Sequence, residues 1–98
     1  MTLKHVREEI DQTDSQLIRL LARRAELSRT VGRMKAAAGL PIEDRERERQ
    51  VLRRIGAILG ESDEAVSAVR IYEQILTESR ELQRCERAEM LTDAEASR

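Results

Sequence analysis

The first forty residues carry the longest helical pattern of the chain. Between Thr2 and Ala38 there is no proline, and Gly32 is the first glycine. Apolar residues recur every seven positions in two rows, as they do along one side of a long amphipathic helix. We therefore predict a single helix of roughly 36 residues, about 54 Å long. Thr2 suits its N-cap, and Gly39 followed by Pro41 would end it.

Two cations stand on the apolar side of this helix. The two rows, which we call the seam, are Leu3, Ile10, Leu17, Arg24 and Val31, and Val6, Thr13, Leu20, Leu27 and Met34. A guanidinium cannot lose its proton, and burying one alone costs on the order of several kcal/mol. Lys35 is rotated by only about 20° from Arg24 and lies roughly 16 Å further along the axis. No acidic residue occupies the seam, so the pattern predicts an anionic partner for both cations.

The remaining sequence predicts two more helices and an all-α fold. One aromatic residue, one proline and 38% charged residues in a chain of 98 favour long helices over a sheet. A second helix should start near Asp44 and end between Gly56 and Gly60, and Ser62 suits the cap of a third. We expect one helical domain over residues 1–87, at whose end the third helix frays, and a mobile C-terminal tail over residues 88–98.

Composition excludes several classes of function. With 18 basic and 19 acidic residues and a net charge of −1, general nucleic-acid binding is not expected. A single cysteine, Cys85, fits a reducing compartment, and neither a signal-peptide pattern nor an apolar run of membrane-spanning length occurs. The lone His5 has no metal-ligand companions, and there is no glycine-rich phosphate loop. We expect a soluble, cytoplasmic protein without a metal, a cofactor, or a nucleic-acid or membrane partner.

Each predicted helix places a pair of polar residues on its apolar face. Taken singly, each has a structural explanation, such as a register-setting arginine, a helix cap or a lysine that extends to solvent. Their coincidence in three helices instead predicts a site inside the bundle, built from facing side chains. The six residues are Arg24, Lys35, Asp44, Glu48, Ser79 and Gln83.

Six short fragments have an order and spacing found in a known family. They are Val6–Asp11 with Asp14, Leu20–Arg24, Val31–Lys35, Gly39–Ile42, Asp44–Glu48, and Ile75–Ser79 with Gln83. In this arrangement the chain resembles the all-helical chorismate mutases, the AroQ class, over about residues 6–83. The resemblance implies eight functional residues: Arg7, Arg24, Lys35, Asp44, Arg47, Glu48, Ser79 and Gln83. The connection over residues 58–63 looks about one residue short for the family.

The resemblance also implies a reaction, the Claisen rearrangement of chorismate to prephenate in the shikimate pathway to phenylalanine and tyrosine. This unimolecular step needs no nucleophile, metal or cofactor. The arginines of the set, together with Ser79, would bind the two carboxylates. Which arginine binds which carboxylate is left open. Lys35 and Gln83 would donate to the ether oxygen as negative charge grows there. Glu48 and the region of Asp44 would hold the ring hydroxyl.

Helix geometry separates Arg7 from the rest of this set. Along one straight helix Arg7 lies roughly 25 Å from Arg24 and roughly 42 Å from Lys35. A ligand the size of chorismate cannot touch all three in one chain. If Arg7 belongs to the site, a second copy must supply it, and a helix this long also leaves much of its seam uncovered. Both points favour an intertwined homodimer with two shared sites, the arrangement that the resemblance implies.

Three alternatives stay open at this stage. An isochorismate-pyruvate lyase or a mutase of 4-amino-4-deoxychorismate would use the same fold, although the acidic pair of Asp44 and Glu48 suits a 4-hydroxyl and favours chorismate. The third alternative is a non-catalytic helical interaction module. In such a module Arg24 and Lys35 would pair with acidic side chains or solvent, without a closed polar cavity.

Overall fold

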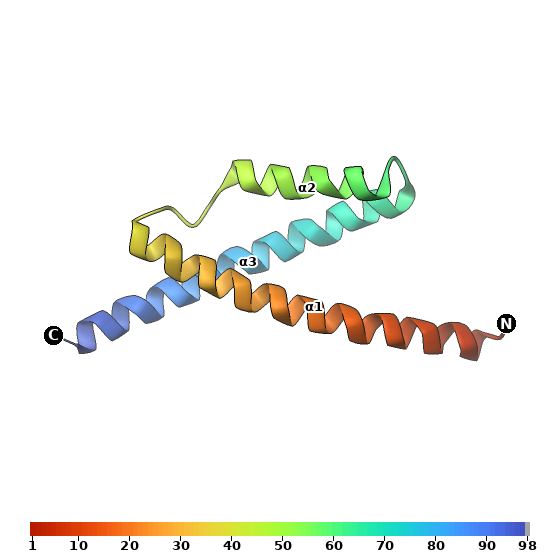
Figure 1. The fold of residues 1–98 in the computed structure, drawn as a ribbon, viewed down its shortest axis with the longest axis horizontal. Coiled ribbons are helices and arrows are strands. Elements are labelled where there is room, and N and C mark those ends of the chain that lie inside the picture. Colours follow the sequence, from red (N-terminus) through yellow and green to blue (C-terminus); the bar gives the residue numbers. More distant parts are fainter. Residues whose placement is uncertain (98) are drawn as a thin grey trace.

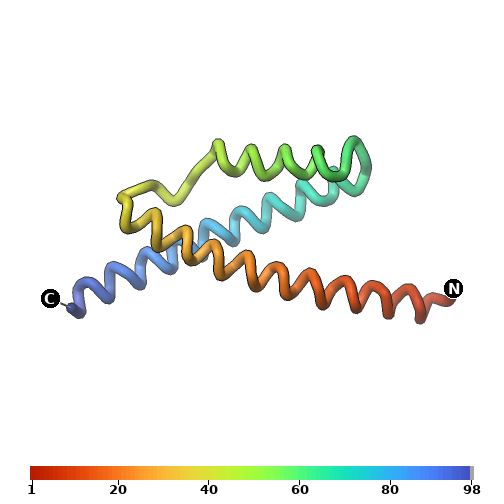
Figure 2. Tube along the Cα trace, in the orientation of Figure 1, coloured from red at the N-terminus to blue at the C-terminus, as the bar shows by residue number. Residues whose placement is uncertain are grey.

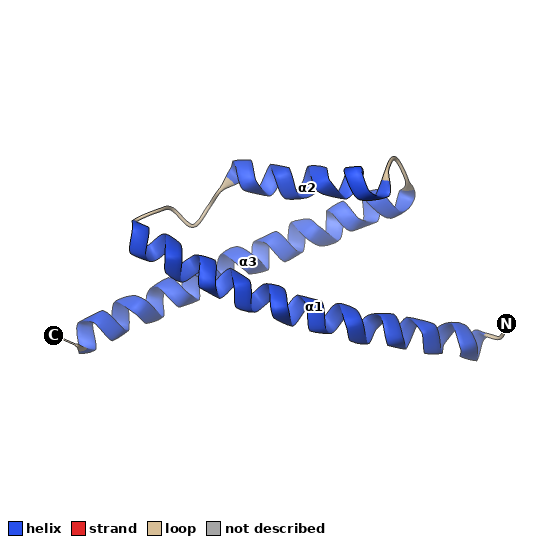
Figure 3. Cartoon of the chain, viewed as in Figure 1, coloured by secondary structure: helices blue, strands red, loops and turns tan. Residues whose placement is uncertain are grey.

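The protein is built from three α-helices. The computed structural model describes residues 1–97, and the helices are α1 (Leu3–Ala38), α2 (Arg45–Leu59) and α3 (Asp63–Ala96). Over this part of the chain there is no strand (Figure 3), which confirms the predicted all-α fold. In the described residues, no helix is both long and apolar enough to cross a membrane.

The helix boundaries follow from their capping residues. Thr2, Asp44 and Ser62 each accept a hydrogen bond from the backbone N–H three residues later, at 3.2, 3.0 and 3.1 Å. Gly39 and Gly60 follow α1 and α2 with φ angles of 67° and 69°, a region that side chains with a Cβ rarely adopt. The predicted starts of all three helices, and the ends of the first two, are therefore confirmed.

The third helix is longer than expected. It has 34 residues, nearly as many as the 36 of α1, and it continues to Ala96 instead of fraying near residue 87. After that point the sequence is rich in alanine, glutamate, methionine and leucine and contains no glycine or proline, so helix propensity alone favours continuation. Most side chains over residues 88–97 are exposed. The domain boundary at residue 87 and the mobility of the tail stay predictions, and Arg98 lies outside the described residues.

The helix α3 lies at the centre of the arrangement. It crosses α1 and runs beside α2, which lies along the N-terminal half of α3 (Figure 1, Figure 2). No Cα atom of α1 comes within 8 Å of one in α2. The two termini lie at opposite ends of a shape measuring 64 × 28 × 14 Å. One chain therefore forms an open, elongated arrangement.

The side of α1 that meets α3 lies next to the seam, and its buried residues are Ser28 and Gly32. A Cβ atom on Gly32 would lie 2.9 Å from the Cα of Gln83, so the close crossing requires glycine there. Much of the seam stays exposed within one chain, where Leu20 and Met34 are each 66% exposed.

The apolar core of a single chain is small. In the described part, the buried apolar side chains are Ile55, Ala65 and Leu76. A chain of this length normally buries more than half of the surface that it exposes when unfolded. The small core and the uncovered seam indicate that much of the apolar surface has no partner within the chain.

Candidate active site

A cavity of about 350 Å³ lies where the end of α1, the start of α2 and the middle of α3 meet. Seven of the eight predicted site residues line it, and Arg7, near the far end of α1, does not. The seven are Arg24, Lys35, Asp44, Arg47, Glu48, Ser79 and Gln83. The structure thus brings together residues separated by up to 59 positions in the sequence.

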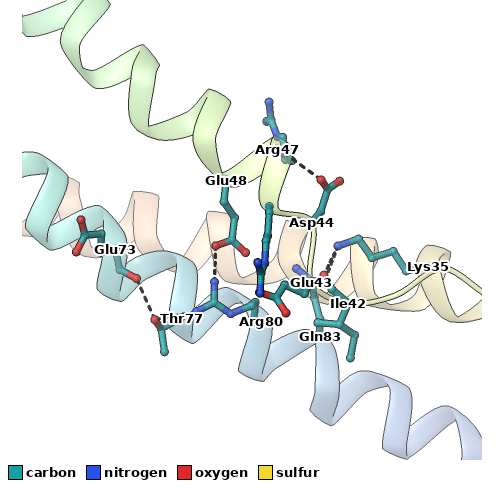
Figure 4. A network of polar contacts seen from close by, with 11 residues as sticks. Lys35, Ile42, Glu43, Asp44, Arg47, Glu48, Glu73, Thr77, Arg80 and Gln83 are labelled. Carbon is teal, nitrogen blue, oxygen red and sulfur yellow. Dashed lines mark hydrogen bonds and ion pairs between the residues drawn. The ribbon is translucent and has the colours of Figure 1, made fainter.

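Lys35 is held in place by two oxygen atoms. Its Nζ donates to the backbone carbonyl of Ile42 at 2.7 Å and to Oε1 of Gln83 at 3.0 Å (Figure 4). The connection that carries Ile42 is itself fixed to α3, because Arg87 donates to the carbonyl of Leu40. An ammonium has three protons, so one remains for a ligand. The amide nitrogen of Gln83 has no hydrogen-bond partner among residues 1–97 and can also donate.

Arg24 has no acidic partner among residues 1–97. Its guanidinium carbon lies 5.9 Å from the centroid of the Tyr72 ring, within the range of a cation–π contact. Within the described residues, no carboxylate forms an ion pair with Arg24 or Lys35. Both cations are half-buried and line one cavity. The acidic partners expected for a non-catalytic module are therefore not found.

Glu48 forms an ion pair with Arg80, a residue that the sequence analysis missed. The two side chains point toward one another from α2 and α3 (Figure 4), and each is 24% exposed. Arg80 also donates to Thr77 Oγ1 at 3.2 Å. The one available signal was the position of Arg80 between the predicted site residues Ser79 and Gln83. Adjacent residues of a helix are rotated by about 100° about its axis, so Arg80 was not expected to share a face with Ser79.

Ser79 also has a partner that was not predicted. Its hydroxyl oxygen lies 2.6 Å from that of Ser28, and both side chains are buried. Ser28 follows Arg24 by four residues and so lies on the same side of α1, which was the only signal for it. A hydrogen bond between two hydroxyl groups uses one of their two protons and leaves the other for a ligand in the cavity.

The remaining predicted residues, Asp44 and Arg47, are exposed and line the same cavity at the start of α2. The carboxylate of Asp44 accepts from the backbone N–H of Arg47 at 3.0 Å, which caps α2. With these two, the cavity is lined by four cationic and two anionic side chains, a net charge of +2. Such a lining suits a small molecule with two negative charges.

The helical fold and the lining of this cavity define a class of small all-α proteins with a cationic cavity between their helices. The sequence identifies the family within this class. Residues 6–84 match the model of the family described as chorismate mutase type II. The chain belongs to the chorismate mutase type II family, as the sequence resemblance implied.

Related proteins span different shares of the chain. The chorismate mutase of Methanocaldococcus jannaschii is 31% identical over 84 residues, which cover 84% of each protein. A bifunctional chorismate mutase/prephenate dehydratase of Aquifex aeolicus is 45% identical over 53 residues, 54% of this chain and 15% of that protein. A 3-dehydroquinate dehydratase of Pyrobaculum aerophilum is 52% identical over 54 residues. The chain thus spans 15% and 18% of the lengths of the latter two relatives.

A solved structure supports the fold. A conserved hypothetical protein from Pyrococcus furiosus is 42% identical and superposes with a TM-score of 0.70. The match covers 85% of this chain and 96% of the other. Most of the three-helix arrangement is therefore shared with a protein of nearly the same extent.

Proposed function

We propose that the protein is a chorismate mutase that converts chorismate to prephenate. The observation that carries this proposal is the placement of Arg24 and Lys35, without acidic partners, in one cavity of net charge +2. Chorismate carries two carboxylates, and membership of the chorismate mutase type II family supports the same substrate. The eight predicted site residues are proposed to act together on it.

The first task of the site is to select a rare shape of the substrate. The side chain of chorismate must fold over its ring before the new C–C bond can form. Cations on opposite sides of the molecule can hold both carboxylates in that geometry, which converts a rare conformer into the bound one. Arg24, Arg47 and the free hydroxyl proton of the Ser28–Ser79 pair are the donors that one chain offers.

The second task is to stabilise the transition state. The C–O bond breaks ahead of C–C formation, so negative charge grows on the ether oxygen. Lys35 and Gln83 each keep a free N–H group, and these groups are proposed to donate to that oxygen. Because Ile42 and Gln83 hold Lys35 before any ligand arrives, little reorganisation is needed during the reaction. Glu48 is proposed to accept a hydrogen bond from the ring hydroxyl.

We further propose that the enzyme is an intertwined homodimer in which the second chain supplies Arg7. The radius of gyration of one chain is 17.5 Å, against about 13 Å for a compact chain of this length. The seam residues Leu3, Ile10 and Leu17 are 65%, 51% and 51% exposed. A partner chain would bury this apolar surface and could bring its own Arg7 to the cavity.

The proposed reaction belongs to the biosynthesis of aromatic amino acids, and we place it in the cytoplasm. The exposed Cys85 has no disulfide partner, which fits a reducing compartment.

A two-substrate assay tests the proposed activity. The purified protein is supplied separately with chorismate and isochorismate, and the loss of each is followed by ultraviolet absorbance. Pyruvate release is followed with a coupled lactate dehydrogenase reaction. We expect chorismate to disappear as prephenate forms, without pyruvate. Pyruvate release from isochorismate, with chorismate unchanged, would instead identify a lyase on the same fold.

A further inference from the structure

Both carboxylates of the cavity already have partners within the chain. Asp44 accepts from the first turn of α2 at the Arg47 N–H, where the helix dipole favours negative charge. Glu48 pairs with Arg80. Neither carboxylate is therefore an uncompensated negative charge toward a ligand.

We propose that Arg80 is a positioning residue that makes the site select a hydroxyl over an ammonium group at the ring carbon facing Glu48. The inference rests on the proposed function, since it assumes a chorismate-like dianion whose ring group reaches Glu48. Arg80 thereby discriminates against 4-amino-4-deoxychorismate, which carries an ammonium group where chorismate has its hydroxyl.

The ion pair favours a neutral ligand group on electrostatic grounds. A carboxylate without a partner attracts an ammonium more strongly than a hydroxyl, because only the ammonium adds a full opposite charge. With Arg80 bound to it, Glu48 keeps free lone pairs that can accept a hydrogen bond from a hydroxyl group, while the guanidinium repels a second cation. Both side chains are 24% exposed, so solvent screens this repulsion less than it would at an open surface.

The charge of the whole cavity acts in the same direction. Chorismate carries two negative charges and matches the lining, whose net charge is +2. The amino analogue has a net charge of −1, because its ammonium offsets one carboxylate. Removal of the Arg80 charge would lower the lining to +1 and leave Glu48 without its partner, which suits the analogue better.

Arg80 is also anchored on the side away from Glu48. Its second terminal nitrogen donates to Thr77 one turn earlier on α3, and Thr77 donates in turn to the carbonyl of Glu73 (Figure 4). These bonds hold the guanidinium toward α2. The arrangement therefore fixes where Glu48 lies before a ligand binds.

The test compares kcat/KM for chorismate and 4-amino-4-deoxychorismate in four proteins. They are the unchanged protein and the variants Arg80→Gln, Arg80→Lys and Arg84→Gln. Lysine keeps the charge. Arg84 is a matched control on the same helix, because it is exposed and its one ion pair within residues 1–97 is with Glu81 at 3.1 Å. Circular dichroism checks that each variant is folded, and Arg80→Met, which keeps an apolar stem, replaces Arg80→Gln if that variant is unfolded.

We expect the unchanged protein to prefer chorismate and Arg80→Gln to lower this preference by about tenfold or more. Arg80→Lys should stay within about threefold of the original preference, and Arg84→Gln should not alter it. Equal losses on both substrates, or an unaltered preference in Arg80→Gln, would make Arg80 merely structural and overturn the inference. If the unchanged protein converts chorismate, the proposed function stands whatever the variants do. If it converts neither substrate, both the proposed function and the inference fail.

Discussion

Lys35 is the residue whose environment most directly fits the proposed chemistry. Its ammonium is fixed by the carbonyl of Ile42 and the amide oxygen of Gln83 and retains one proton for a ligand. We expect Lys35→Ala to lower kcat by about two to three powers of ten, the scale for loss of one oxyanion-type donor. Steady-state kinetics at saturating chorismate would measure this. Arg29→Ala serves as the control, because Arg29 is exposed on the same helix and lies outside the seam. Near-normal turnover by Lys35→Ala would remove the role assigned to this lysine.

Residue type and helical face, both readable from the sequence, were enough to predict six of the residues that line the cavity, and the family resemblance added Arg47. Arg24 and Lys35 stood out because a cation on an apolar face needs an explanation. Arg80 and Ser28 did not, because an arginine in a charged helix and a serine beside the seam are ordinary on a solvated surface. Their importance arises from partners 32 and 51 residues away, and such pairings depend on how the helices cross.

The crossing of α1 and α3 depends on one glycine. Gly32 faces the backbone of Gln83, and an added Cβ would lie 2.9 Å from its Cα. We expect Gly32→Ala to destabilise the fold by about 1–3 kcal/mol through overpacking and to lower kcat, because Gln83 must move. Gly56→Ala is the control, since Gly56 lies in α2 with no atom within 4 Å of an added Cβ. Alanine there should stabilise by up to about 1 kcal/mol.

Chemical denaturation and chorismate kinetics on the two glycine variants would check this pair of expectations. If Gly32→Ala unfolded at the same denaturant concentration as the original protein and kept its kcat, the close approach would not matter to the site.

The helices themselves were largely predictable, because their boundaries are set locally. Thr2, Asp44 and Ser62 start them and Gly39 and Gly60 follow the first two, so capping chemistry was sufficient. The end of α3 was not predictable in the same way. No glycine or proline follows Gly60, and the expected fraying rested on the poor order that is typical of the last residues of a domain. Propensity carries it on to Ala96.

At the scale of the whole molecule, one chain leaves too much apolar surface exposed. In the described part, three apolar residues are buried, and most apolar side chains of the seam are exposed along α1. The seam could be read from the sequence, but the face of α1 that meets α3 could not, since Ser28 and Gly32 carry no apolar signal. A second chain packed on the seam would bury this apolar surface and could bring its own Arg7 close to the cavity.

A shared site makes a quantitative prediction for mixed dimers. Arg7→Ala and Arg24→Ala chains should each be nearly inactive alone, because each lacks one cation of every site. After the two are refolded together, random pairing makes about half of the dimers hybrids, each with one complete site, so about a quarter of the original activity should return. Chorismate consumption, normalised to the dimer measured by light scattering, gives this fraction.

The matched control mixes Arg24→Ala with Lys35→Ala. These two residues line the cavity of the same chain, so every site in a hybrid still lacks one of them, and no activity should return. Recovery only in the first mixture requires that position 7 of one chain and position 24 of the other serve the same site. Recovery in neither mixture would instead confine each site to a single chain or exclude Arg7 from it. In either case the uncovered seam would need an explanation other than a shared catalytic site.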